Sequence, residues 1–184
     1  CAGDEGFVEA YHDRIRETVT SGLDEAARRA LHERLAGALR DSEDADPEAL
    51  GYHFRAAGML DAARDYAKQA ARQASESLAF DRAARLCRLA LELLEPGDPD
   101  AHALRVSLAE ALRNLGRSPE AAKVYLEAAE SAPEDTARKL RQAAAEQLLL
   151  SGHVDAGLAT TKSVLESLGA RPPATRNAGL AGLV

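Results

Sequence analysis

Aromatic and β-branched residues are scarce in this 184-residue sequence. Tryptophan is absent, and phenylalanine, tyrosine and tryptophan together make up 4% of the residues, although 46% of the sequence is hydrophobic. Alanine and leucine supply most of that hydrophobic fraction. The shortage of β-branched and aromatic side chains argues against a large sheet, while alanine has the highest helix propensity and lets helices approach one another closely. The composition therefore predicts an all-α protein.

Cysteine and long apolar runs are also lacking. The two cysteines, Cys1 and Cys87, are too few for a disulfide framework. Cys87 lies inside a helical apolar pattern, which predicts a small core residue. No apolar run reaches membrane-spanning length, and the sequence does not start like a signal peptide. We therefore expect a reducing, cytoplasmic setting and no membrane contact.

Positive charge is in the minority, with 23 basic against 30 acidic residues and a formal net charge of −7. A protein that binds phosphates needs a clustered positive surface. Direct nucleic-acid binding is therefore not expected.

Signatures of catalysis and metal binding are missing from the sequence. It has no Gly-rich loop ending in Gly-Lys-Ser/Thr, no kinase Gly-rich loop and no His-Arg-Asp motif. The five histidines are widely spaced, and none has the ligand spacing of a zinc site. The acidic run 41–46 lacks the alternation and central glycine of a calcium loop, so it predicts a solvated loop. We expect no enzyme activity, no cofactor and no metal in this chain.

What the sequence does contain is a succession of helical patterns with capping signals. Asp24 and Asp46-Pro47 are expected to begin helices, Ser118-Pro119 is expected to cap a later one, and Gly58 is expected to end one. Leu31, Leu35, Ala38 and Leu39 are expected to form the apolar stripe of the first helix. The expected helices span about 24–39, 47–58, 61–77, 80–94, 100–115, 118–131, 134–151 and 154–168.

The most regular pattern lies within residues 102–135. Small residues fall where two helices must touch, a glycine falls at the turn, and a proline follows the second helix. Weaker versions recur around Gly152 and, half a repeat out of phase, around Gly58. The latter indicates either an irregular joint near residues 58–78 or a chance match. The full pattern reads Leu108-Ala109-x2-Leu112-x3-Gly116-x4-Ala121-x3-Tyr125-x2-Ala128-x4-Pro133.

This spacing resembles the tetratricopeptide repeat (TPR). The resemblance implies a right-handed α-solenoid of helical hairpins over residues 23–169, with a concave groove that takes peptides or partner proteins. One such hairpin cannot bury its apolar face alone, so it requires neighbours. An exposed repeat end also leaves open a homo-oligomer. The hairpins expected are 24–57, 61–95, 99–132 and 134–169.

Further segments are similar to the junction between the winged-helix end of a bacterial signalling ATPase module and its helical repeats. These segments are Tyr11–Glu17, Arg28–Ala36, His53–Gly58 and Leu78–Cys87. The similarity implies a parent resembling Ser/Thr protein kinase–ATPase–TPR proteins or STAND-type ATPase regulators. It also implies that residues 1–22 are the C-terminal edge of a winged-helix-like domain. Residues 170–184, with Arg171-Pro172-Pro173, are expected to form a linker or the start of a further helix.

The family's concave face is lined by the first helix of each hairpin, which singles out a set of candidate partner-binding residues. Val106 and Glu110 stand where a carboxylate-clamping groove would need polar or basic groups, so a receptor for a C-terminal carboxylate is not expected. The alternative is that all of these side chains are exposed to solvent and bind no partner. The set comprises Lys68, Arg72 and Glu76, then Val106, Glu110, Arg113 and Asn114, then Gln142, Glu146 and Leu149.

These observations predict a non-catalytic protein-interaction or regulatory module of a multidomain bacterial signal-transduction protein. Its partner would be a protein, a peptide or an adjacent domain of the parent chain. Two alternatives remain open at this point. One is a structural spacer that self-associates, and the other is a domain that senses a small-molecule effector in a transcription regulator.

Overall fold

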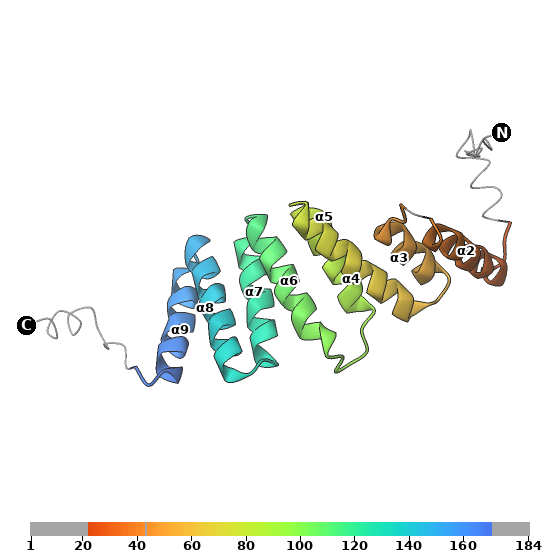
Figure 1. Ribbon diagram of the computed structural model, residues 1–184. Coiled ribbons are helices and arrows are strands. Elements are labelled where there is room, and N and C mark those ends of the chain that lie inside the picture. Colours follow the sequence, from red (N-terminus) through yellow and green to blue (C-terminus); the bar gives the residue numbers. More distant parts are fainter. Residues whose placement is uncertain (1–21, 43, 171–184) are drawn as a thin grey trace, which may run out of the picture. The chain divides into compact units, whose positions relative to one another are not determined.

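The computed structural model describes residues 22–42 and 44–170, and this part of the chain forms eight helices and no strand (Figure 1). The all-α prediction is therefore confirmed. Cys1, the predicted winged-helix edge and the Pro172-Pro173 linker lie outside the described residues. The helices are α2 (Glu25–Arg40), α3 (Pro47–Ala56), α4 (Leu60–Glu76), α5 (Phe80–Glu92), α6 (Asp100–Asn114), α7 (Ser118–Glu130), α8 (Glu134–Leu150) and α9 (Val154–Ser167).

The chain divides into two compact units between Ala63 and Arg64. The first contains α2 and α3, the second contains α5 to α9, and α4 begins in the first unit and continues into the second. The boundary falls within residues 58–78, where the sequence pattern indicates either an irregular joint or a chance match.

In the described part of the first unit, α2 and α3 are both capped at their beginning. The side chain of Asp24 accepts a hydrogen bond from the backbone N–H of Ala27 at 2.7 Å, and that of Asp46 accepts one from Glu48 at 3.1 Å. Both carboxylates thus satisfy N–H groups that have no partner inside the helix, as the sequence predicts. α2 contacts α3, which contributes the buried residues Leu50 and Phe54.

The predicted apolar stripe of α2 is mostly exposed, and only Leu39 of its four residues is half-buried. Leu31 and Leu35 are 40% and 39% exposed, and Ala38 is exposed as well, whereas Ala36 is completely buried. A helix buries the residues where its partner comes closest, and a small residue permits the closest approach. The spacing of the leucines therefore did not identify the buried face.

In the second unit each helix from α5 onward contacts the next one in the chain. Figure 1 shows α6 to α9 side by side. A core cluster made mostly of alanine extends from α4 to α8. Every helical position of the 102–135 pattern is buried within it, including Leu112, Ala121 and Tyr125. The short side chains explain how consecutive helices pack with few large residues between them.

The start of α7 differs from the prediction. Its N-cap is Arg117, which makes no side-chain capping bond, and Ser118 is already helical. The hydroxyl of Ser118 donates instead to the side-chain oxygen of Gln147 at 2.9 Å. Gln147 is only 5% exposed, so its amide oxygen needs a partner inside the protein.

Five helices end in the same backbone turn. In each, one residue has a positive φ, its N–H bonds to the carbonyl three residues earlier, and the next N–H bonds to the carbonyl five residues before it. This is the Schellman arrangement that ends helices. The Gly58 turn is therefore the same as the turns at Gly116 and Gly152. The positive-φ residues of these five turns are Gly58, Leu78, Gly116, Gly152 and Gly169.

Leu78 is the exception among these turns, because a leucine has φ +60° where the others have glycine. A left-handed conformation costs a non-glycine residue about 1–2 kcal/mol, and Leu78 is 72% exposed, so its side chain gains little by burial. We expect Leu78→Gly to raise the free energy of unfolding by about 0.5–1 kcal/mol, because the greater freedom of glycine in the unfolded chain offsets part of the gain. Urea denaturation followed by circular dichroism measures this change.

The matched control is Gly116→Ala. A Cβ there would meet no atom within 4 Å, so its effect arises from the backbone alone, at φ +72°. We expect it to lower the free energy of unfolding by about 1 kcal/mol. Shifts of the same sign in both variants would show that the left-handed conformation does not govern the stability of these turns.

Candidate functional site

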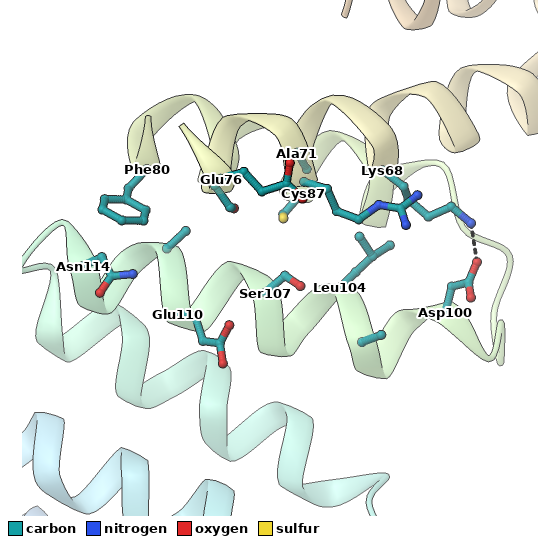
Figure 2. A pocket seen from close by; sticks show the side chains of 14 residues that line it. Lys68, Ala71, Glu76, Phe80, Cys87, Asp100, Leu104, Ser107, Glu110 and Asn114 are labelled. Carbon is teal, nitrogen blue, oxygen red and sulfur yellow. Dashed lines mark hydrogen bonds and ion pairs between the residues drawn. The ribbon is translucent and has the colours of Figure 1, made fainter. Parts of the chain in front are cut away.

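A groove runs between α4 and α6, with the start of α5 at one end (Figure 2). Its volume is about 440 Å³. We call it the central groove. It is lined by Lys68, Ala71, Arg72, Ser75 and Glu76 of α4, Phe80 and Cys87 of α5, and Asp100, Ala103, Leu104, Ser107, Glu110, Ala111 and Asn114 of α6.

Helical spacing explains why these side chains line one surface. Lys68, Arg72 and Glu76 follow one another at intervals of four residues, and residues of α6 recur at intervals of three and four, so each set occupies one face of its helix. At about 1.5 Å per residue, α6 extends the groove over roughly 21 Å. An extended chain rises about 3.3 Å per residue, so roughly six residues would span that length.

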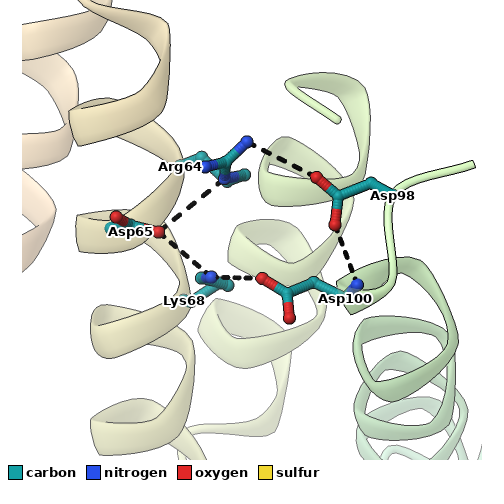
Figure 3. Close-up of polar contacts among 5 residues, drawn as sticks. All are labelled: Arg64, Asp65, Lys68, Asp98 and Asp100. Carbon is teal, nitrogen blue, oxygen red and sulfur yellow. Dashed lines mark hydrogen bonds and ion pairs between the residues drawn. The ribbon is translucent and has the colours of Figure 1, made fainter. Parts of the chain in front are cut away.

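One end of the groove is closed by ion pairs (Figure 3). The ammonium group of Lys68 lies 2.5 Å from a carboxylate oxygen of Asp100 and 3.0 Å from one of Asp65. The hydrogen bond to Asp100 is the largest cause that raises the pKa of Lys68, and the same bond lowers the pKa of Asp100. The side chain of Asp98 accepts the backbone N–H of Asp100 at 2.8 Å and lies 3.5 Å from Arg64. The network ties α4 to the beginning of α6.

The middle of the groove has small side chains and a buried thiol. Figure 2 shows Ala71, Leu104 and Ser107 around Cys87. Cys87 is free and 1% exposed, and burial raises the pKa of its thiol to about 11. A protonated thiol is neither a nucleophile nor a metal ligand. The prediction of a core cysteine is confirmed.

The other end of the groove combines an aromatic ring with carboxylates from both helices. Figure 2 shows Phe80 and Asn114 at this end, with Glu76 on one side and Glu110 on the other. The part of the chain that the structure describes provides no hydrogen bond or ion pair to the side chain of Glu76, Glu110 or Arg72. These charged groups therefore differ from Lys68, whose charge is already compensated.

The structure brings five of the candidate residues together in the central groove: Lys68, Arg72, Glu76, Glu110 and Asn114. Another group of candidates, Gln142, Glu146 and Leu149, lines a smaller cavity of about 210 Å³ with Thr161 and Val164 of α9. There the amide of Gln142 donates to Glu146 at 3.2 Å.

Val106 and Arg113 line neither cavity. Val106 packs against the core cluster, and Arg113 is exposed but acts electrostatically on the hydroxyl of Tyr125. Burial is the main cause that raises the pKa of Tyr125. Arg113 opposes this shift, while Glu110 and Glu146 add to it.

The sequence did not single out Phe80, Asp100 or Ser107 as groove residues. Phe80 and Asp100 belong to the first turns of their helices, where they look like ordinary starting residues. Ser107 could have been found, because it lies three residues before Glu110 and seven before Asn114 on the same helical face.

Two histidines that are distant in sequence meet in the first unit. The Nδ1 atoms of His32 and His53 are 2.9 Å apart, and the ring of Tyr52 contacts both imidazoles edge-on. Burial is the larger cause, and His32 the smaller, that lowers the pKa of His53. The pair cannot be recognised from the sequence, because His32 and His53 are 21 residues apart and only the packing of α2 against α3 brings them together. Across residues 22–42 and 44–170, no three His, Cys, Asp or Glu side chains are placed to hold a metal ion.

Comparison with known proteins does not assign this chain to a family. No protein-family model matches the chain, and a search of curated proteins finds no match either. Among the described helices, none combines the length and the apolar character needed to cross a membrane.

Proposed function

We propose that this chain is a non-catalytic, TPR-like interaction module that binds an extended peptide segment of a partner in the central groove. The groove itself carries the proposal. It gathers polar side chains from two helices around a floor of small residues over a length suited to an extended peptide. Charged groups without a partner in the described chain, such as Arg72 and Glu110, are available for recognition.

A right-handed solenoid is part of this proposal. It is supported by the contacts between consecutive helices of the second unit and by the identical turns at Gly116 and Gly152. The sequence resemblance supports the wider context, a repeat region in a multidomain bacterial signalling protein. In that context the peptide would come from a separate partner protein or from another domain of the same parent.

The test is a selection of ligands from a randomised ten-residue peptide library displayed on phage, followed by fluorescence polarisation with the recovered peptides. Ser107 is exposed in the middle of the groove, so Ser107→Arg should fill the groove and weaken binding about ten-fold or more, equivalent to about 1.4 kcal/mol. The matched control is Ser163→Arg, which makes the same change at an exposed position of α9 outside both cavities. Its affinity should stay unchanged.

Two outcomes would contradict the proposal. One is a selection that enriches no peptide, as expected of a structural spacer. The other is equal peptide affinity of the unsubstituted chain and the Ser107→Arg variant, which would place the binding site elsewhere.

A small-molecule effector site is the second candidate. The groove volume of about 440 Å³ lies within the range of about 300–1,000 Å³ that is common for ligand pockets. Thermal-shift screening with sugars and nucleotides distinguishes the two candidates, because a small-molecule site predicts a stabilising compound that also displaces any selected peptide.

A further inference from the structure

We infer that the central groove recognises an extended peptide with an acidic and a basic side chain two residues apart. This inference rests on the proposed peptide-binding function. The acidic side chain would face Arg72. The basic one would face the end of the groove formed by Glu76, Phe80, Glu110 and Asn114, which we call the acidic end.

The order of the two ligand charges follows from which charged side chains of the groove already form ion pairs. Lys68 is held by Asp100 and Asp65 at 2.5 and 3.0 Å, which leaves Arg72 as the groove cation without an ion pair in the described chain. A guanidinium group can receive a carboxylate through two parallel hydrogen bonds, and such charge-assisted bonds are roughly twice as strong as neutral ones. Arg72 therefore suits an aspartate or glutamate of the ligand.

The acidic end has the opposite chemistry. Glu76 comes from α4 and Glu110 from α6, so carboxylates approach the groove from both of its helices. The ring of Phe80 lies at the same end (Figure 2), and an aromatic face attracts a cation placed over it. The side-chain oxygen of Asn114 adds an acceptor for an N–H donor. Lysine and arginine satisfy all of these features, whereas an acidic side chain would be repelled.

The spacing between the two sites points to an extended ligand. Arg72 and Glu76 are four residues apart on α4, a rise of about 6 Å. In an extended chain, side chains two residues apart face the same side and are separated by about 6.6 Å. A helical ligand could present charges at a similar distance four residues apart, but a helix is about 10–12 Å across. It would lie largely above a groove of about 440 Å³.

A charge-reversal selection tests the inference with the same randomised ten-residue library. With the unsubstituted chain, we expect the selection to enrich peptides that have an acidic and a basic residue two positions apart, always in the same order along the peptide. The enrichment should be about ten-fold, which corresponds to a preference of about 1.4 kcal/mol. The triple variant Arg72→Glu/Glu76→Lys/Glu110→Lys, which reverses the groove cation and both carboxylates of the acidic end, should enrich the same spacing with the two charges exchanged. Circular dichroism melting of each variant verifies that the chain is folded.

The matched control exchanges an equivalent pair on another helix. Lys123 and Glu127 of α7 are also four residues apart and exposed, with 3.9 Å between the charged atoms. Lys123→Glu/Glu127→Lys should leave the selected pattern unchanged.

The outcomes separate this inference from the proposed function. If no peptide is enriched, the peptide-binding function itself fails. If peptides are enriched and Ser107→Arg abolishes their binding, but they lack the charge pattern or keep its order with the reversed groove, only the inference is wrong. Enrichment of charges four positions apart would assign a helical ligand instead and would likewise overturn it.

Discussion

Replacing Tyr125 with alanine is expected to lower the free energy of unfolding by about 3–5 kcal/mol. Tyr125 is 3% exposed and is the one aromatic residue in the core cluster that the described residues of the second unit form. The same cluster is made mostly of alanines, including Ala109, Ala121 and Ala128, whose short side chains cannot extend into the space that the ring would leave. The cost therefore combines the lost burial of the ring with a cavity that the site does not close. Urea denaturation of the whole chain measures the loss.

Tyr125→Phe is the matched control, because it removes the hydroxyl and keeps the ring. We expect it to cost less than about 1 kcal/mol, since the packing is retained. A loss as large as that of Tyr125→Ala would show that the hydroxyl, close enough to Arg113 and Glu110 for their charges to act on it, stabilises the core more than the ring does.

The second large effect is expected for Ala109→Asp. Ala109 has no exposed surface and lies in the same core cluster. A carboxylate there would lose its water without gaining a partner, which costs about 3–5 kcal/mol. The exposed Ala103 provides the matched control on the same helix, and Ala103→Asp should change the stability by about 0.5 kcal/mol or less.

The pH dependence identifies the cause of the loss in Ala109→Asp. Burial favours the neutral form of the introduced carboxyl group, so the folded variant binds a proton more readily than the unfolded chain does. The destabilisation should therefore grow as the pH rises above about 4, the usual range for an aspartate, and shrink below it. A loss that is the same at low and neutral pH would indicate steric overpacking in place of an unpaired charge.

The positions of the helices were predictable because their signals are local. Asp24 and Asp46 cap their helices through bonds to residues two and three positions away, and Gly116 and Gly152 adopt the left-handed conformation that ends a helix. The turn at Gly58 has the same hydrogen bonds as the other two, but the same turn also ends α4 and α9, so it does not decide between an irregular joint and a chance match. The hairpin pairing and the solenoid remain predictions.

The candidate groove was predictable on α4 and only partly so on α6. On α4 one charged stripe, with Arg72 and Glu76, marks the solvent-facing side. On α6 alanine occurs on both the buried and the exposed faces, so the apolar pattern does not determine the rotation of the helix about its axis. The predicted set of partner-binding residues therefore includes Val106 and Arg113, which lie beside the groove face. It lacks Ser107, which belongs to that face.

The helices, the N-caps of α2 and α3 and most of the helix ends follow from the sequence alone, because these features depend on residues within one or two turns of the chain. The tertiary structure alone decided which face of α2 is buried, that Ser118 contacts Gln147, and that His32 meets His53. It also decided that Lys68 is neutralised by Asp100 while Arg72 remains available. These features depend on residues that are distant in the sequence, and their mutual position follows from how alanine-rich helices pack. A composition with few large side chains encodes that packing only weakly.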